Sequence, residues 1–507
     1  MADILSDCGA RILFVENDEQ LDKALEARPR CPALERIVIF DMNGLRDLAD
    51  PICQSFEAFL ARGAEHDAAH GGDWEAGIAA IAPDSLAVLA YTAGTTGPPK
   101  GVMLSHRNIL FQVEHAARVF GEHPGDERLV FMPMAHAMER ILGLYVAFHS
   151  GTVSNYVESV ETVAENLQEV QPTILCTAPH VWARFHSRIV VANSGATFLQ
   201  RTLYRWAIAA GSREAGARLA GRRAAPWTAA EAWLLRELVL NNVRRELGLN
   251  RLRLGLIGGA AVSAELIRWF MALGLDLVEI YGQTECAGLA AAGKPVPYGE
   301  LAISPAGQVL LRGEHVFKGY WNRSETTART LQGGWLHTGD LGCLERGRLR
   351  ITGRTEDTIT VAAGNAYAAA EIEKELKLSP YIADGVLFGE RQAFLSCLVM
   401  LDQEAVEKWA HDNDVPFTSF ASLVRSQPVR ALIGREVEAA NTRLGGPVAI
   451  RSFRLIEQRL EPGDPELTPM MKLKRGVVGE TYRHLINEMY YGAAEAKASS
   501  AEPAREG

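Results

Sequence analysis

Cysteine is sparse in this sequence, and long apolar runs are missing from it. The 507 residues include seven cysteines, an odd number, and no two of them stand in C-x-x-C spacing. This pattern excludes a disulfide framework or a zinc site of the usual spacing and indicates reduced thiols in a cytoplasmic protein. No segment has the roughly 18 uninterrupted apolar residues that a membrane-spanning helix requires, and the acidic N-terminus is unlike a signal peptide.

An excess of positive charge is missing as well. The formal net charge is −10, which argues against nucleic acid as a partner. The composition, with 48% hydrophobic and 22% charged residues, is that of an ordinary globular protein. A chain of this length is too long for one core, so two or three domains are expected.

A phosphate-binding loop is the strongest local signal, although it is not a Walker loop. An apolar run at 86–90 predicts a buried strand, and it leads into hydroxyls, glycines and a lysine. A Walker loop needs G-x-x-x-x-G-K before Ser or Thr, whereas Lys100 is followed by Gly101 and by a second predicted strand. Glycine backbone donors, threonine hydroxyls and a lysine charge suit an anion. The candidate phosphate-binding residues are Thr92, Gly94, Thr95, Thr96, Gly97 and Lys100.

Further strands predict a parallel sheet with a ligand crevice at its edge. Residues 11–15, 20–27 and 36–40 read as a β-α-β unit with two buried strands, a unit typical of parallel sheets. Two apolar strands at 254–257 and 277–280 end in a glycine turn and in Y-G-Q-T-E. Nucleotides bind at the carboxyl edge of such strands in α/β folds.

These motifs together resemble the adenylate-forming superfamily, in its long-chain fatty acyl-CoA synthetase branch. The resemblance rests on the loop at 91–101, M-P-M-A-H-A-M-E-R at 132–140, Y-G-Q-T-E at 281–285, G-W-L-H-T-G-D-L-G at 334–342 and the lysine-bearing stretch at 466–475, which occur in family order. Members of the family usually carry a substantial segment before the point at which this chain begins. The chain is therefore expected to lack the beginning of the N-terminal domain.

The resemblance assigns roles to residues. It implies that Gly259, Ala260 and Tyr281 adjoin the adenine, that Thr284 lies near the α-phosphate, and that Gly282 belongs to the nucleotide site. It also implies that Asp340 accepts both ribose hydroxyls and that Arg354 contacts the ribose or phosphate. It implies Thr95 and Glu285 as Mg²⁺ ligands, a functional His136 near the reacting carboxylate, and Lys472 as the lysine that stabilises charge during adenylation. The alternative for His136 is a packed core histidine, and the alternative for Lys472 is an ordinary solvated surface patch.

The expected fold class is α/β. A large N-terminal AMP-binding domain of parallel-type sheets with flanking helices is expected at 1–353. A small, mobile α+β domain at 354–491 would follow a hinge, and a tail at 492–507, rich in Ala, Glu and Ser, would be disordered.

The implied activity is ATP-dependent conversion of a fatty acid, with a long chain favoured, to acyl-AMP and then to acyl-CoA. ATP, Mg²⁺ and coenzyme A would take part, and AMP and pyrophosphate would leave. A ligase that passes the acyl group to a carrier protein is one alternative, and a non-enzymatic nucleotide-binding remnant is another.

The segment 201–253 bears on the partners of the protein. It holds eleven arginines, no lysine and four glutamates. A solvated basic face is favoured, and attraction to anionic lipid at the inner face of a membrane, or to CoA phosphates, is the alternative. A homodimer is left open.

Overall fold

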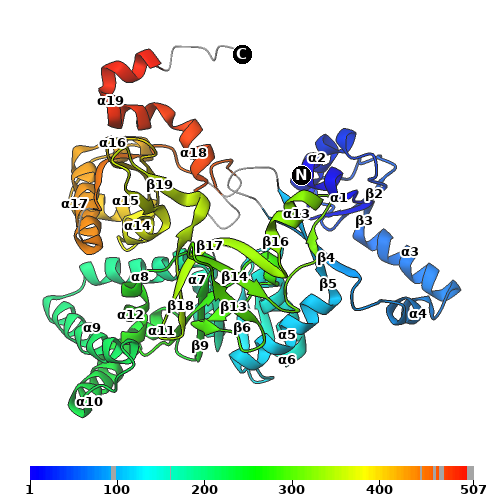
Figure 1. The fold of residues 1–507 in the computed structure, drawn as a ribbon, viewed down its shortest axis with the longest axis horizontal. Coiled ribbons are helices and arrows are strands. Elements are labelled where there is room, and N and C mark those ends of the chain that lie inside the picture. Colours follow the sequence, from blue (N-terminus) through cyan, green and yellow to red (C-terminus); the bar gives the residue numbers. More distant parts are fainter. Residues whose placement is uncertain (93–98, 160–161, 446–447, 461–463, 468–472, 500–507) are drawn as a thin grey trace.

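The structure, a computed structural model, describes residues 1–92, 99–159, 162–445, 448–460, 464–467 and 473–499. It comprises a large N-terminal domain and a smaller C-terminal domain, both built from helices and sheets (Figure 1). In Figure 1 the C-terminal domain, coloured yellow to red, lies over one side of the green and cyan body, and the first residues, in dark blue, lie toward the other side. The predicted α/β class is confirmed.

The N-terminal segment forms a small parallel sheet. Strands β1 (Ile12–Val15), β2 (Arg36–Ile39) and β3 (Cys53–Ser55) pair in that order, and α2 (Asp18–Ala27) connects the first two. The predicted β-α-β unit is therefore confirmed. Strand β2 is largely buried, but Ile12 and Phe14 of β1 are exposed, so the prediction of two buried strands was wrong for β1.

The phosphate-loop strands belong to a separate antiparallel sheet of β4 (Leu86–Thr92), β5 (Lys100–Ser105) and β15 (Gly319–Tyr320). The prediction that 86–90 form a buried strand was wrong, because β4 is the edge strand and is only half-buried. Ser105 caps α5 (His106–Phe120) by accepting from the backbone N–H of Asn108.

The largest sheet provides the expected crevice edge. Its strands are β6 (Glu127–Val130), β7 (Val153–Tyr156), β8 (Ile174–Thr177), β9 (Leu254–Gly258), β10 (Leu277–Tyr281), β11 (Ala291–Ala292) and β12 (Lys294–Pro295). They lie in the order β12-β11-β10-β9-β8-β6-β7, and the strands from β10 to β7 are parallel. Ile280 pairs with Gly258, so the carboxyl ends of β9 and β10 lie side by side.

A fourth sheet brings the remaining nucleotide motif to this edge. It is antiparallel and contains β13 (Glu300–Ile303), β14 (Gln308–Arg312), β16 (Leu331–Gln332), β17 (Trp335–Glu345) and β18 (Arg348–Arg354). In the β17–β18 pair, Asp340 lies directly opposite Arg354.

Helices pack around these sheets. The remaining helices of the N-terminal domain are α1 (Ala2–Cys8), α3 (Phe56–Ala69), α4 (Asp73–Ala79), α6 (Val146–Ser150), α7 (Val163–Val170), α8 (Pro179–Ser194), α9 (Phe198–Leu219), α10 (Pro226–Leu235), α11 (Asn241–Glu246), α12 (Ala264–Ala272) and α13 (Ser324–Thr330). Two π-helical stretches, η2 (Met138–Tyr145) and η3 (Arg236–Leu240), interrupt them, and short 3₁₀ turns include η4 (Thr284–Cys286) and η5 (Thr355–Asp357).

The C-terminal domain has its own core. Its strands are β19 (Thr358–Thr360), β20 (Ala366–Ala368), β21 (Ile382–Phe388), β22 (Leu395–Leu401) and β23 (Ile450–Leu455), and its helices are α14 (Ala369–Leu376), α15 (Gln403–Asp412), α16 (Phe420–Arg425), α17 (Gln427–Leu444), α18 (Arg475–Thr481) and α19 (Arg483–Ser499). Buried residues from Ile359 to Leu455 form one apolar cluster. Helix α19 extends to Ser499, and the predicted disorder of the tail at 492–507 stays a prediction.

No helix among the described residues combines the length and apolar character needed to cross a bilayer.

Candidate nucleotide-binding site

A hydrogen-bonded cluster surrounds the carboxylate of Asp340. Tyr281 Oη donates to Asp340 Oδ2 at 2.8 Å, and Gln283 Nε2 donates to the same oxygen at 2.9 Å. Arg354 Nε donates to Asp340 Oδ1 at 2.9 Å. The structure thus brings together three residues that the sequence had placed in the site, namely Tyr281, Asp340 and Arg354.

The fold explains why these residues meet. Tyr281 is the last residue of β10, whereas Asp340 and Arg354 face each other across the β17–β18 pair. Asp340 is mostly buried, with 13% of its side chain exposed, while the Arg354 side chain is 46% exposed. Burial, and then the Asp340 charge, raise the pKa of Tyr281, so its hydroxyl remains a donor at neutral pH.

A second cluster adjoins the first around Glu285. Tyr320 Oη donates to Glu285 Oε1 at 2.8 Å. The ammonium group of Lys100 lies 5.0 Å from the centroid of the Tyr320 ring, within the range of a cation–π contact. One tyrosine therefore links the predicted metal-binding carboxylate to the lysine of the phosphate loop.

The glycine turn after β9 lies beside these groups in the parallel sheet. Gly259 has φ = 85°, a conformation that side-chain-bearing residues rarely adopt, and both Gly259 and Ala260 are exposed. Gly282 and Thr284 follow Tyr281 and are half-buried. An open turn of backbone therefore lies next to the end of β10.

His136 precedes η2, and a buried ion pair joins the first turn of η2 to β6. Its Nδ1 accepts from the backbone N–H of Met138 at 3.3 Å, and burial lowers its pKa. Arg128 of β6 donates through Nη2 to Glu139 Oε1 at 2.6 Å, and both of these side chains are buried. Removing either partner would leave a buried, unpaired charge, so the Arg128–Glu139 ion pair holds the start of η2 against β6. His136 lies directly before this start of η2.

Several predicted residues lie outside the described part of the chain. They are Gly94, Thr95, Thr96, Gly97 and Lys472. Their described neighbours are well anchored. Thr92 ends β4, and Tyr91 beside it donates to Asp7 Oδ2 at 2.6 Å. The backbone N–H of Leu473 donates to Asp384 Oδ2 in β21 at 3.1 Å.

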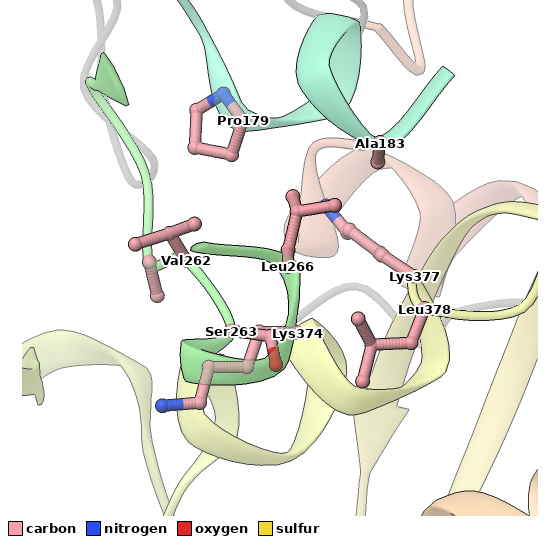
Figure 2. Close-up of a pocket in the computed structure, with 9 residues that line it drawn as sticks. Pro179, Ala183, Val262, Ser263, Leu266, Lys374, Lys377 and Leu378 are labelled. Carbon is pink, nitrogen blue, oxygen red and sulfur yellow. The ribbon is translucent and has the colours of Figure 1, made fainter. Parts of the chain in front are cut away.

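The two domains meet close to the glycine turn. Figure 2 shows a cavity of about 20 Å³ lined by Pro179, Val262, Ser263 and Leu266 from the N-terminal domain and by Lys374, Lys377 and Leu378 from the C-terminal domain. A space of that size holds about one water molecule, so the cavity is a packing gap and does not hold a nucleotide. It marks where the C-terminal domain rests on the turns that precede α8 and α12.

Comparison with known proteins agrees with this arrangement. The family model "AMP-binding enzyme" matches residues 1–321, and "AMP-binding enzyme C-terminal domain" matches residues 356–494. The chain belongs to the AMP-binding enzyme family.

Relatives of this chain include the long-chain-fatty-acid–CoA ligase FadD15 of Mycobacterium bovis. It is 30% identical to this chain in an alignment that covers 96% of this chain and 81% of the relative. The long-chain-fatty-acid–CoA ligase ACSBG2 of Gallus gallus is 29% identical, and the alignment covers 97% of this chain and 69% of the relative. The fold resembles the A-PCP didomain of carboxylic acid reductase from Segniliparus rugosus in complex with AMP. That likeness has a TM-score of 0.71 at 19% identity and covers 98% of this chain and 68% of the other.

Family membership does not by itself identify the residues that bind Mg²⁺. Among the described residues, no group of three His, Cys, Asp or Glu side chains could hold a metal ion. Mg²⁺ in nucleotide enzymes, however, is usually held by one or two carboxylates together with phosphate oxygens and water. Glu285, with one oxygen bonded to Tyr320, fits that kind of site.

Sequence reasoning missed the residues that support the assigned ones. Gln283 occupies the variable position of Y-G-x-T-E, and Tyr320 lies 35 residues beyond Glu285. Arg128 lies in a strand that carries no motif. The Gly319-Tyr320 pair could be noticed in the sequence. Its place beside Lys100, however, follows only from the pairing of β15 with β5.

Proposed function

We propose that this protein activates a fatty acid with ATP to form acyl-AMP and then transfers the acyl group to coenzyme A, releasing AMP and pyrophosphate. The observation that carries the proposal is the Asp340 cluster at the carboxyl end of β10, beside Glu285. The names of the related fatty-acid–CoA ligases support the substrate class, and they support a long acyl chain.

Asp340 would bind the ribose of ATP. An ionised carboxylate offers about four acceptor positions and forms strong hydrogen bonds with hydroxyl groups. Three donors already use this carboxylate, so two ribose hydroxyls require at least one of them to move. Of the three donors, Arg354 is exposed, whereas Tyr281 and Gln283 are half-buried. Arg354 also lies at the end of β18, so it is the donor that we expect to turn toward phosphate.

Adenine and phosphates would lie on either side of that ribose. Gly259 and Ala260 present open backbone for the adenine next to Tyr281, and Gly282 and Thr284 lead toward the α-phosphate. Lys100, together with Thr92 and the loop residues Gly94, Thr95, Thr96 and Gly97, would bind the β- and γ-phosphates.

Glu285 and Thr95 would hold Mg²⁺, which when bound neutralises phosphate charge. Tyr320 keeps the Glu285 carboxylate in place through its hydroxyl and contacts Lys100 through its ring. Lys472 would stabilise the charge that develops at the α-phosphorus as the fatty acid carboxylate attacks. His136, neutral because burial lowers its pKa, would line the approach of that carboxylate.

The acceptor in the second step distinguishes this proposal from its nearest rival. We place coenzyme A there because the named relatives are CoA ligases. An acyl-AMP ligase would instead transfer to a carrier protein. A cytoplasmic location and a rotating C-terminal domain with a boundary near residue 354 stay predictions from the sequence, and the oligomeric state stays open.

The test is a product assay on the purified chain with ATP, MgCl₂ and fatty acids of graded length. We expect AMP and pyrophosphate to form only with a fatty acid, and acyl-CoA to form when coenzyme A is added. Transfer to a phosphopantetheinylated carrier protein, with none to coenzyme A, would favour the rival ligase. Nucleotide binding without any turnover would favour a non-enzymatic scaffold.

A further inference from the structure

The segment that carries Lys472 is closed at its base by residues on either side of it. Leu467 and Leu473 form an isolated antiparallel bridge, and the backbone N–H of Lys474 donates to the carbonyl oxygen of Glu466 at 2.7 Å. Both leucines are buried, and they pack in an apolar cluster with residues of β21 and β22. The described residues at the two ends of this segment are therefore fixed to each other and to the sheet of the C-terminal domain.

Asp384 of β21 holds the residue that directly follows Lys472. Its Oδ2 accepts from the backbone N–H of Leu473 at 3.1 Å, and Nζ of Lys377, just after α14, lies 2.6 Å from its Oδ1. Asp384 is only 3% exposed. A carboxylate buried to that extent stays ionised only with a charged partner, and an ionised carboxylate is the stronger acceptor. Lys377 therefore keeps Asp384 in the form that binds the Leu473 N–H most strongly.

A second buried carboxylate holds the chain two residues further on. Glu373 Oε1 of α14 accepts from Arg475 Nη2 at 2.8 Å and from the backbone N–H of Leu387 in β21 at 3.0 Å. Arg475 Nη1 also donates to the carbonyl oxygen of Leu387. Because Arg475 begins α18, the start of this helix is joined to α14 and to β21, the strand that also holds Leu473.

The Asp384–Lys377 pair lies on the side of the C-terminal domain that contacts the N-terminal domain. Lys377 lines the small cavity between the domains together with Pro179 and Ala183 of the N-terminal domain (Figure 2). Lys472 has to reach a nucleotide held by the N-terminal domain, and a long side chain does so in a reproducible position only if its backbone is fixed. A misplacement of about 1 Å costs a catalytic group about 10²-fold in rate.

We propose that Asp384, paired with Lys377, is a positioning residue for adenylation, because it fixes the backbone next to Lys472. The inference rests on the proposed function, in which Lys472 stabilises the charge that develops at the α-phosphorus. Asp384 acts through the backbone N–H of Leu473 and contacts no substrate in this role. Its removal should therefore impair the step that needs Lys472 and spare the step that does not.

The two half-reactions, measured separately on the full chain, test the inference. Adenylation is followed by fatty-acid-dependent exchange of pyrophosphate into ATP. Acyl transfer is followed by single-turnover formation of acyl-CoA from supplied acyl-AMP, a step that begins after the attack on the α-phosphorus. Asp384→Ala removes the acceptor, whereas Asp384→Asn keeps an oxygen for the N–H of Leu473. The matched control is Asp402→Ala, because the Asp402 carboxylate also accepts from a backbone N–H in this domain, that of Ala405 at the start of α15.

We expect Asp384→Ala to slow exchange about tenfold or more at saturating ATP, with little change in KM for ATP, and to leave acyl transfer within about twofold of wild type. Asp384→Asn should recover most of the lost exchange, and Asp402→Ala should alter neither half-reaction. In a Lys472→Ala background, Asp384→Ala should have no further effect on exchange, since a residue that acts only through Lys472 has nothing left to position. Should Asp384→Ala misfold by circular dichroism, Asp384→Ala/Lys377→Met removes both charges of the pair and serves the same purpose.

Three results would overturn the inference. They are normal exchange in Asp384→Ala, equal losses in both half-reactions, and an equal loss of exchange from Asp384→Ala with and without Lys472. Each of these leaves the proposed function in place as long as Lys472→Ala alone slows exchange. Near-normal exchange in Lys472→Ala would instead overturn the proposed role of that lysine, and no exchange in the wild type would overturn the proposed function, and this inference would fall with either.

Discussion

Replacing Asp340 by alanine should weaken ATP binding without unfolding the protein. The carboxylate accepts from Tyr281, Gln283 and Arg354 in the free protein and would accept from two ribose hydroxyls in the complex. Hydrogen bonds to a charged acceptor contribute about 1.5–3 kcal/mol, which corresponds to a dissociation constant about 10- to 150-fold higher. The Asp340–Arg354 ion pair is partly screened, because Arg354 is half-exposed, so the cost in folding stability should be small.

Isothermal titration calorimetry with ATP measures the effect, and thermal unfolding confirms that the variant is folded. A matched control is Glu300→Ala, which removes another carboxylate from a cross-strand arginine pair, Glu300–Arg312, in the same sheet. The control should bind ATP as the wild type does. A folded Asp340→Ala variant with unchanged ATP affinity would refute the ribose assignment.

Three further predictions concern the metal site, the catalytic lysine and pH. Tyr320→Phe should raise the Mg²⁺ concentration needed for half-maximal ATP–pyrophosphate exchange about tenfold, because Glu285 loses a hydrogen bond while the ring under Lys100 remains; an unchanged Mg²⁺ dependence would contradict the bridging role. Lys472→Ala should slow fatty-acid-dependent exchange by about 10² or more and leave ATP affinity nearly intact, as expected for a group that acts in the transition state; near-normal exchange would disprove it. Burial raises the pKa of Glu122 from 4.5 to about 7, so its neutral form stabilises the fold below pH 4.5 and that contribution is lost as the pH rises through about 7. Glu122→Gln should therefore gain stability relative to wild type over that interval in urea titrations, and a pH-independent difference would contradict the shift.

The crevice between β9 and β10 could be predicted from the sequence because its signal is local. Each strand is a short apolar run that ends in glycine or polar residues, and parallel pairing then follows from the α/β pattern. Asp340 and Arg354 could be assigned from the family resemblance, and the register of β17 with β18 explains their contact.

What the sequence could not provide depends on contacts between distant segments. The 86–90 run looks like a buried strand, yet β4 pairs with β5 alone and stays half-exposed. An apolar run predicts that its residues are buried on average, but it does not indicate whether the strand lies at the edge or in the middle of a sheet. Tyr320 likewise acquires its place from pairing with β5, over 200 residues earlier in the chain.

The arginine-rich segment 201–253 shows the same limit from another side. The abundance of arginine at 201–253 is plain in the sequence, but the ion pairs that neutralise part of it are formed with residues such as Glu127 and Asp276 from other elements. The helical positions of Trp227 and Trp233 likewise do not reveal that both side chains are exposed, since tryptophan at such spacing is more often buried.

Fatty-acid-dependent exchange of labelled pyrophosphate into ATP tests the central proposal most directly, because it reports acyl-adenylate formation without requiring the second step. We predict exchange that needs Mg²⁺ and a fatty acid but no coenzyme A, together with acyl-CoA formation once coenzyme A is added. A folded protein that binds ATP, yet exchanges no pyrophosphate with any fatty acid from short to long, would contradict it.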